Sequence, residues 1–352
     1  MRILINDFIG GVLDRGIPLY VRNLIDGLRE EGFSVSVIRA PGLCRKMPRG
    51  LFYLLAVLVE QTLLPVIGCY LRATLTIYPY NSVAVVDLLT RRGRIVVHDL
   101  EQLNRPLSFS KLYYRFCYRA VRWRGAPIFT ISEISRQRLV ESGLFGRGEI
   151  TILPNTFYAF ERLAAAERPA REAAILLCTG STANKDLETL VTEYLPPVLA
   201  RGYAVSILGL HKQSDMPRLE ALRDFMKSGQ LRLCGQLSDR QVAREYRAHR
   251  IVWVHSLREG FGRCVVEGRL AGSRVVASDI PEFAGLRDED VHLYRDASEF
   301  MASLIRLMSR EATAAPYAGY RYRELLRAGA QRGLNVTAGQ SAAQAPRARP
   351  VR

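Results

Sequence analysis

The stretch HSLREGFGRCVVEGRLAGSRVVASDIPE, residues 255–282, decides the fold class. It follows a short apolar run, residues 251–254, of the kind that forms a buried strand. A loop with two glycines around Phe261 comes next, then an apolar segment with near-helical spacing and a second apolar run, residues 274–277. Strand, glycine loop, helix and strand in this order predict one unit of an α/β domain with a parallel sheet.

The loop and helix of this stretch carry groups suited to a ligand that is part phosphate and part polyol. Gly260 and Gly262 allow backbone N–H groups to approach a ligand, and the N-terminus of the following helix favours an anion. Glu259 on the loop and Glu267 in the helix can accept hydrogen bonds from hydroxyl groups. A nucleotide-sugar combines both kinds of group, so the residues predict a nucleotide-sugar site.

Residues 258–282 resemble the signature of the group 1 glycosyltransferases, a retaining family with the GT-B fold. That pattern is a glutamate, Gly-Phe-Gly, a second glutamate after seven intervening residues, a small-residue turn and a Val-Val-Ala-Ser-Asp strand. Strand–loop–helix–strand units also occur in unrelated α/β domains, but without this density of matching positions. The resemblance implies an α/β chain with two Rossmann-like, doubly wound parallel-sheet domains that face a cleft.

Four segments are expected along the chain. An N-terminal, acceptor-side domain is predicted for residues 1–165 and a nucleotide-sugar-binding domain for 166–315. The charged, alanine-rich residues 161–172 look like the linker between them. The resemblance implies that a helix in 316–334 crosses back to the first domain. Residues 335–352 are small, polar and proline-bearing, which is typical of a disordered tail.

The resemblance assigns site residues in the N-terminal half as well. His98 follows an apolar run, residues 94–97, and therefore lies at the carboxyl edge of the predicted sheet, where the family's histidine contacts the donor sugar. A satisfied structural histidine is the alternative. Gly11 and Gly16, in the loop after the first strand, are both candidates for a glycine that closely approaches the transferred group.

In the second domain a glycine turn leads into a helix, with a lysine that can reach back to a diphosphate. The turn is Gly180-Ser181, and Lys185 follows. Ser181 stands where the family usually has an arginine, so one positive charge is missing, and Arg263 or Arg258 would have to compensate. The turn at Gly235-Gln236 suits the edge of a nucleobase, as the family implies.

The predicted catalytic residues are therefore His98, Lys185 and Glu259, with Glu259 orienting the sugar hydroxyls and Glu267 holding the ribose. The remaining donor-binding residues are Gly11, Gly16, Gly180, Ser181, Gly235, Gln236, Gly260, Phe261, Gly262, Arg263 and Glu267. No metal site and no cofactor are expected, because no Asp-x-Asp stands at a donor-like strand end. The acidic run at 287–290 is interpreted as a solvated turn.

The net charge of +16 narrows the partners to nucleic acid, an anionic membrane or a phosphate-rich substrate. Four cations fall on one face of the predicted helix 111–124, with aromatic residues between them: Lys111, Arg115, Arg119 and Arg122. This pattern fits docking on an anionic membrane and fits an ordinary solvated helix face equally well. Nucleic acid is the least favoured partner.

Two further observations bear on location. Residues 51–71 are apolar over a transmembrane length, but Glu60-Gln61 at the centre and Pro65 favour a buried or interfacial helix over a span. The six scattered cysteines and the absence of a signal-like N-terminus favour a reducing cytoplasm, on the inner face of the membrane if the helix is interfacial.

The function predicted from these residues is transfer of a hexose-type sugar from a nucleoside diphosphate to an acceptor hydroxyl. The resemblance implies retention of the anomeric configuration and a lipid-linked or polysaccharide acceptor in cell-surface glycan synthesis. The alternative is a catalytically weak GT-B protein that docks on anionic membranes, which the missing charge at Ser181 favours.

Overall fold

The chain divides into two compact units. Unit 1 comprises Met1–Thr156 and Tyr322–Arg352, and unit 2 comprises Phe157–Arg321. The computed structural model describes residues 2–11, 16–100, 108–146, 148–167, 169–210, 213–310, 317 and 320–337. Of the expected disordered tail, residues 335–352, residues 335–337 belong to the last helix, and the remainder lies outside the described residues.

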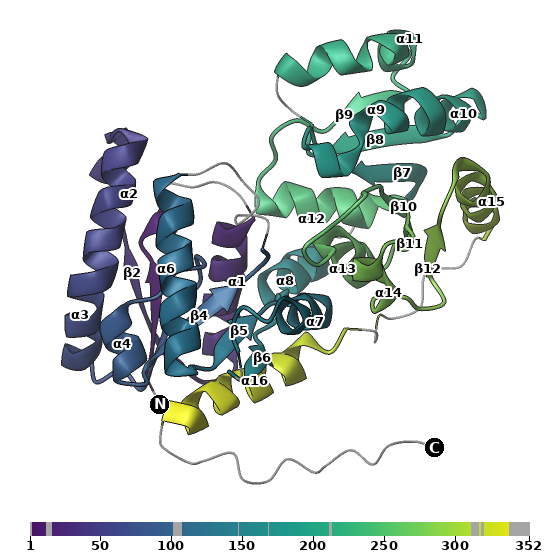
Figure 1. The fold of residues 1–352 in the computed structure, drawn as a ribbon. Coiled ribbons are helices and arrows are strands. Elements are labelled where there is room, and N and C mark those ends of the chain that lie inside the picture. The colour runs from purple at the N-terminus through teal and green to yellow at the C-terminus, as the bar shows by residue number, and fades with distance from the viewer. Residues whose placement is uncertain are drawn as a thin grey trace. The chain divides into compact units, whose positions relative to one another are not determined.

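Unit 1 contains a six-stranded sheet in the order β2-β1-β3-β4-β5-β6, with every pair parallel (Figure 1). Its strands are β1 Arg2–Asp7, β2 Ser34–Arg39, β3 Leu75–Tyr78, β4 Gly93–Val97, β5 Ile128–Thr130 and β6 Ile150–Ile152. All residues of β3, β4 and β5 are buried. Burial on both faces requires continuous apolar runs, which is why these strands were recognisable in the sequence.

The helices of unit 1 are α1 Ile17–Glu30, α2 Arg49–Leu58, α3 Leu64–Tyr70, α4 Val85–Leu89, α6 Phe109–Arg124, α7 Glu133–Ser142 and α16 Tyr322–Thr337. Short 3-10 turns occupy η1 Ile9–Gly11 and η2 Gly42–Lys46, and a π turn, η3 Val59–Leu63, joins α2 to α3. The C-terminal helix α16 packs against α1, β3 and β6.

Unit 2 also contains a six-stranded parallel sheet, in the order β12-β11-β10-β7-β8-β9. The strands are β7 Glu172–Cys178, β8 Ala204–Leu208, β9 Leu231–Leu233, β10 His249–Val254, β11 Arg274–Ser278 and β12 Val291–Tyr294. Chain order reverses between β7 and β10. In doubly wound sheets such a switch point forms a crevice at the carboxyl ends of the strands.

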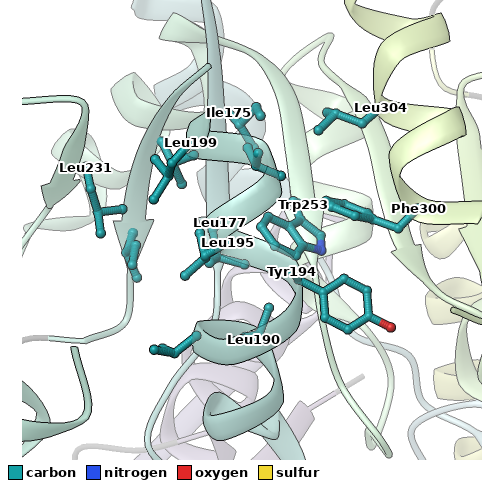
Figure 2. Packing of buried hydrophobic residues seen from close by; sticks show 14 of the residues in the cluster. Ile175, Leu177, Leu190, Tyr194, Leu195, Leu199, Leu231, Trp253, Phe300 and Leu304 are labelled. Carbon is teal, nitrogen blue, oxygen red and sulfur yellow. The ribbon is translucent and has the colours of Figure 1, made fainter. Parts of the chain in front are cut away.

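The helices of unit 2 are α8 Tyr158–Ala166, α9 Leu187–Thr189, α10 Leu195–Ala200, α11 Arg223–Lys227, α12 Asp239–Ala248, α13 Arg263–Leu270, α14 Pro281–Ala284 and α15 Ala297–Met308, with turns η4 Ala183–Lys185, η5 Leu190–Tyr194 and η6 Gln213–Leu222. The core centres on Trp253, which is fully buried and stacks on Phe300 at 4.3 Å, with Tyr194 beside both rings (Figure 2). Leucines of β7 and α10 complete this packing.

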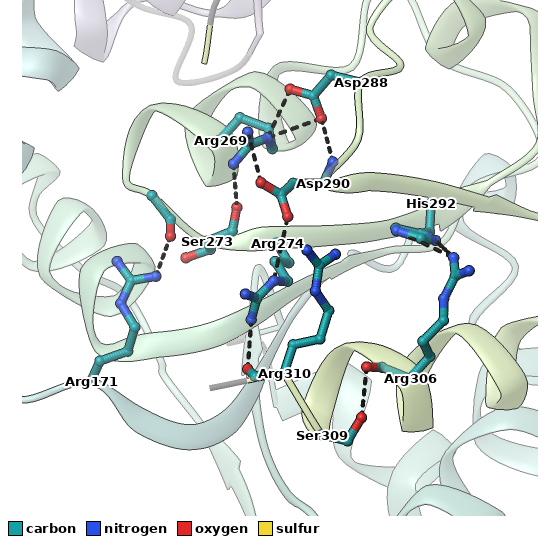
Figure 3. Close-up of polar contacts among 11 residues, drawn as sticks. Arg171, Arg269, Ser273, Arg274, Asp288, Asp290, His292, Arg306, Ser309 and Arg310 are labelled. Carbon is teal, nitrogen blue, oxygen red and sulfur yellow. Dashed lines mark hydrogen bonds and ion pairs between the residues drawn. The ribbon is translucent and has the colours of Figure 1, made fainter. Parts of the chain in front are cut away.

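Two expectations about local structure are wrong, and one strand was missed. Residues 161–166, expected in a linker, belong to α8, whose Phe160 packs edge-on against Tyr246 of α12 at 5.5 Å. The strand β12 was not predicted. The acidic run before it is not a solvated turn, because Asp288 and Asp290 pair with Arg269 of α13, whose side chain is fully buried (Figure 3).

Candidate functional site

The switch point of unit 2 brings two predicted site loops together. Strands β7 and β10 pair in register up to Cys178 opposite Val254. Beyond these residues β7 continues into Gly180 and Lys185, and β10 continues into the loop that carries Glu259. The two loops therefore start side by side, although their sequence positions differ by more than seventy residues.

Lys185 and Glu259 form an ion pair through Nζ and Oε1, and the Ser256 hydroxyl donates to the same Oε1 at 2.7 Å. The two side chains are 17% and 18% exposed, so solvent screens the pair only in part. Burial lowers the pKa of Lys185, but the negative charges of Cys264 in its thiolate form and of the Glu259 carboxylate outweigh it, and the pKa is raised overall. Lys185 is therefore cationic at neutral pH.

Asn184 fastens the two loops to each other. Its carbonyl accepts from the Leu257 amide at 2.8 Å, and its Nδ2 donates to the Arg258 carbonyl at 3.0 Å. Because both bonds involve backbone groups of the Glu259 loop, they hold Lys185 and Glu259 at a defined separation before any ligand arrives.

Gly262 is required where the loop enters α13. Its φ is +93°, and a Cβ there would lie 2.6 Å from the Phe283 ring. The preceding Phe261 is buried and packs against Tyr320 at 4.8 Å, whereas Gly260 is exposed. The Gly-Phe-Gly pattern thus fixes the turn that presents the N-terminus of α13 beside Glu259.

Arg263 and Glu267 bind each other on the first turns of α13. Arg263 Nη2 donates to Glu267 Oε1 at 2.8 Å, and its guanidinium lies 4.5 Å from the centroid of the Phe157 ring. Glu267 is buried. Arg263 or Arg258 was expected to compensate for the charge missing at Ser181, and in this structure the Arg263 guanidinium is engaged by Glu267 and Phe157.

A different arginine lies next to Ser181. Arg218 of η6 donates from Nη1 to the Ser181 carbonyl at 3.4 Å. Together with Thr182, Asp186 and Leu187, Arg218 lines a pocket of about 930 Å³, part of which is open to solvent. Sequence reasoning missed Arg218, because no recognisable motif marks it within η6.

His255 is a second residue that the sequence pattern did not indicate. Its Nδ1 is 2.7 Å from the Tyr294 hydroxyl, and its Nε2, buried and without a hydrogen-bond partner among the described residues, is 4.0 Å from Asp186 Oδ2. Burial lowers its pKa to about 4, so the ring is neutral at pH 7. A buried ring nitrogen directed at the lysine loop is a polar group that a ligand can satisfy.

Gly180, Gly235 and Gln236 lie on loops after β7 and β9. Gly180 borders Lys185, because a Cβ added at Gly180 would lie 3.9 Å from Lys185 Cγ. Gly235 has a φ of +72° and open space around it, and Gln236 is exposed. These positions are accessible to a ligand, and no contact between them and the Lys185–Glu259 pair is found in the described residues beyond that of Gly180.

His98 lies in unit 1, at the end of β4, and is buried. Its Nε2 bonds to the Pro79 carbonyl at 2.9 Å, and the Tyr20 ring packs edge-on at 4.8 Å. Burial lowers the pKa of His98 to about 4, so it is a neutral hydrogen-bonding group. His98 belongs to unit 1, whereas the Lys185–Glu259 pair belongs to unit 2.

Of the described glycines in the first loop, Gly10 is packed tightly against its neighbours, and the approach of Gly11 or Gly16 to the transferred group stays a prediction. A Cβ at Gly10 would lie 2.0 Å from Asp7 Oδ1 and 2.4 Å from the Tyr80 hydroxyl, which bond to each other at 2.7 Å. Gly11 ends η1, and Gly16 caps α1 with no atom of the described residues within 4 Å of its Cβ position. Gly10 thus lets η1 pass close to Asp7 at the switch point of unit 1.

No group of three histidine, cysteine, aspartate or glutamate side chains able to hold a metal ion is found among the described residues. Asp288 and Asp290 are instead engaged by Arg269 and Arg274.

Residues 173–310 match the family model of glycosyl transferases group 1. The match covers most of unit 2, including Lys185, Glu259 and Glu267. No curated protein sequence matches the chain.

Solved structures match both units. Sucrose-phosphate synthase from Thermosynechococcus elongatus is 18% identical, with a TM-score of 0.62 over 97% of this chain and 98% of its own. The starch synthase IV catalytic domain from Arabidopsis thaliana, bound to ADP and acarbose, is 11% identical, with a TM-score of 0.64 over 96% and 99%.

A UDP-GlcNAc 2-epimerase from Methanocaldococcus jannaschii, in complex with UDP-GlcNAc and UDP, is 10% identical, with a TM-score of 0.55 over 93% and 98%. These identities show the fold alone: two six-stranded parallel sheets with flanking helices, as in GT-B glycosyltransferases. The fold occurs in transferases and in an epimerase, and the family model that matches residues 173–310 is that of glycosyl transferases group 1.

Proposed function

We propose that this chain, whose residues 173–310 match the group 1 glycosyltransferases, moves a hexose-type sugar from a nucleoside diphosphate to an acceptor hydroxyl with retention of configuration. The observation that carries the proposal is the Lys185–Glu259 pair at the switch point of unit 2, inside the matched residues. It supplies a cation for a diphosphate and a carboxylate for sugar hydroxyls within one crevice.

The charges suit the transition state of glycosyl transfer. A diphosphate departs with growing negative charge while the sugar carbon becomes cationic. Lys185 and the N-terminus of α13 stabilise the negative charge on the departing diphosphate, because a helix N-terminus presents unpaired N–H groups. Glu259, held by the Ser256 hydroxyl, orients the sugar. Glu267, which binds Arg263 one helical turn before it on α13, holds the ribose. His98 is the proposed sugar contact from unit 1.

We propose that the reaction needs neither a metal nor a cofactor beyond the donor. The acids that follow the site loop are engaged by arginines, and Lys185 supplies the positive charge that a divalent ion supplies elsewhere. Gly180, Ser181, Gly235 and Gln236 provide the accessible loop positions around the donor.

The proposed acceptor is a lipid-linked or polysaccharide glycan, and the proposed location is the cytoplasmic face of the membrane. Support comes from α6, where Arg115, Arg119 and Arg122 are exposed and Lys111 is half-buried. Such a basic face attracts anionic lipid headgroups. The match to starch synthase supports a glycan acceptor through that enzyme's complex with acarbose.

The test is a thermal-shift panel of nucleoside diphosphates and their sugars, followed by a transfer assay with the best donor. Ligand binding raises the melting temperature with the logarithm of saturation, so the panel ranks the bases and sugars directly. A chain that responds to none of them at low salt does not act on nucleotide-sugars.

A second candidate is a donor-binding protein with little turnover, which the serine at position 181 favours. It predicts a full thermal shift with UDP or ADP but neither transfer nor donor hydrolysis. Transfer that is lost in Glu259→Gln, while diphosphate binding persists, contradicts this second candidate.

A further inference from the structure

Exposed apolar side chains are distributed unevenly between the two units. Among the described residues, the large hydrophobic side chains that are exposed in unit 2 are Met216, Leu257 and Ile305, whereas unit 1 has many more. Most of those in unit 1 lie on two neighbouring segments, the helix from Arg49 to Tyr70 and α6. An apolar surface of this extent on a soluble monomer marks an interaction site.

The helix from Arg49 to Tyr70 carries one apolar stripe along its whole length, formed by Leu51, Leu54, Leu58, Leu63, Val66 and Tyr70. Each of these is between 52% and 85% exposed. The first three are spaced by three and four residues, as on one face of an α-helix, and so are the last three. Figure 1 shows α2 and α3 as one continuous rod at the edge of unit 1.

The π turn η3 keeps the two halves of this stripe in line. In a continuous α-helix, the next residue on the same face as Leu58 would be the one four positions later. A π turn closes over one more residue than an α turn, which moves the face to Leu63. The extra residue therefore aligns the stripe instead of interrupting it.

The same π turn places Glu60 on the inner side. Its carboxylate is buried and accepts from Asn6 Nδ2 at 2.7 Å, Ser82 Oγ at 2.9 Å and the Tyr113 hydroxyl at 2.7 Å. The charge at the centre of the apolar segment is thus removed from the stripe and tied to β1 and α6. Leaving the unit to cross a bilayer would break all three bonds, so the helix stays in the fold.

Helix α6 extends the apolar surface. Phe109, Leu112, Phe116 and Trp123, all more than half exposed, are spaced by three, four and seven residues and share one face. Tyr113 joins α6 to the π turn through Gln61 at 2.6 Å. The exposed cations Lys46, Arg49 and Arg72 stand at the two ends of the first helix.

We propose that the outer face of α2, η3 and α3, together with α6, lies in the plane of a bilayer that contains anionic lipid. The six stripe residues enter the acyl boundary, and the flanking arginines remain at the headgroups. Apolar residues on one face with cations around them characterise in-plane helices, and the charge complements an anionic leaflet. The inference deepens the proposed peripheral location and rests on it, but not on the chemistry of transfer.

The test is flotation of the full chain with vesicles of phosphatidylcholine, with and without phosphatidylglycerol. The stripe variant is Leu54→Ser, Leu58→Ser and Val66→Ser. The matched control changes three exposed apolar residues on other helices, Val140→Ser, Ile305→Ser and Leu325→Ser. The wild type and the control should float with the anionic vesicles, and the stripe variant should lose about tenfold or more in vesicle affinity.

The two tryptophans supply an independent readout. Trp123 is 78% exposed on α6, and Trp253 is fully buried in unit 2. Anionic vesicles should shift tryptophan emission to the blue, and the shift should vanish in Trp123→Phe. The thermal shift with nucleoside diphosphate reports that each variant is folded.

Three results would overturn the in-plane proposal. Equal flotation of the stripe variant and the wild type would mean binding by charge alone. Concentration-dependent self-association that the stripe variant abolishes, without vesicle binding, would assign the face to a second copy of the chain. Resistance to alkaline extraction would indicate a span. Transfer to a soluble acceptor should be equal in the wild type, the stripe variant and the control. Absence of transfer in all three would count against the proposed function and leave the in-plane proposal standing.

Discussion

Lys185 and Glu259 neutralise each other in the unliganded crevice. A nucleotide-sugar must therefore offer Lys185 a better partner than Glu259, and a diphosphate with two negative charges does so. Glu259 is left with the Ser256 hydroxyl and becomes available to the sugar. The pair thus links diphosphate binding to sugar orientation.

Removing either member should separate the two roles. Lys185→Ala should weaken UDP or ADP binding by about 1.5–3 kcal/mol, roughly ten- to more than a hundredfold in Kd, because a charge-assisted bond is lost. Glu259→Gln should retain diphosphate binding and lose transfer. Titration calorimetry and a transfer assay measure the two effects. Lys227→Ala, which removes a lysine that is 69% exposed, is the matched control. Unchanged affinity in Lys185→Ala would contradict the assignment.

Arg218 should supply the positive charge that Ser181 lacks, since its guanidinium already reaches the Ser181 carbonyl. Arg218→Ala is expected to weaken diphosphate binding about tenfold. Adding Ser181→Arg to that variant should restore it. Arg223→Ala removes a side chain that is 61% exposed and pairs with Glu220. This control should leave diphosphate binding unaltered. If the double variant binds no better than Arg218→Ala, the two positions do not share a role.

The π turn η3 combines two structural roles in five residues. It keeps the apolar stripe of α2 and α3 aligned, and it directs Glu60 into three hydrogen bonds inside unit 1. Burial raises the pKa of Glu60 from 4.5 to about 7, against the lowering effect of Tyr113, Ser82 and Asn6. The element therefore contains a carboxyl that ionises near neutral pH.

This pKa predicts a specific pH dependence of stability. A carboxyl with a raised pKa in the folded state stabilises the fold below pH 4.5, and this contribution is lost as pH rises to about 7. His98 and His255, whose pKa values are lowered to about 4, act in the opposite direction: their contribution is present above 6.5 and is lost toward pH 4. Glu60→Gln removes only the first effect.

Relative to wild type, the free energy of unfolding of Glu60→Gln should therefore increase by on the order of 3 kcal/mol between pH 4.5 and 8, because only the wild type loses the Glu60 contribution. Urea unfolding at several pH values measures this difference. Glu133→Gln, at an exposed ion pair on α7, is the control and should run parallel to wild type. A Glu60→Gln profile that also runs parallel would show that Glu60 does not titrate in this range.

Unit 1 is completed by the end of the chain. Helix α16 buries Tyr322, Leu326, Ala330 and Leu334. Two of its glycines allow very close packing: a Cβ at Gly329 would lie 2.3 Å from the Ile152 carbonyl, and one at Gly333 would lie 2.5 Å from the Phe129 ring. Strands β5 and β6 thus depend on a helix that follows the whole of unit 2.

Gly329→Ala should therefore destabilise unit 1 by about 1–3 kcal/mol, because the added methyl meets a backbone carbonyl that cannot turn away. Hydrogen exchange should rise in β6 and α1 and stay unchanged in β7 and β10. Gly50→Ala in α2, where no atom lies within 4 Å, should be neutral or slightly stabilising. Equally faster hydrogen exchange in both units would contradict the expectation that Gly329→Ala destabilises unit 1 alone.

Periodicity in the sequence was sufficient for the α/β class, for most strands and for the loop around Glu259, because parallel strands buried on both faces require continuous apolar runs followed by turn residues. Periodicity failed where a strand was short or where the expected boundary of an element was displaced from the actual one. The interpretation of residues 161–172 as a linker left out Phe157 and Phe160, the residues that anchor α8. The strand β12 is only four residues long and half of it is partly exposed.

Proximity between distant residues is a different matter. Lys185 meets Glu259 across 74 positions, and Arg218 meets Ser181 across 37. The family resemblance assigned Lys185 and Glu259 to one site without predicting their ion pair, and no local pattern anticipates the contact between Arg218 and Ser181. Nor did the apolar pattern of residues 51–71 reveal that a π turn aligns one exposed face and buries Glu60. Local sequence specifies which segments are helix or strand, whereas side chains from separate segments come within bonding distance only when the strands take their order in the sheet.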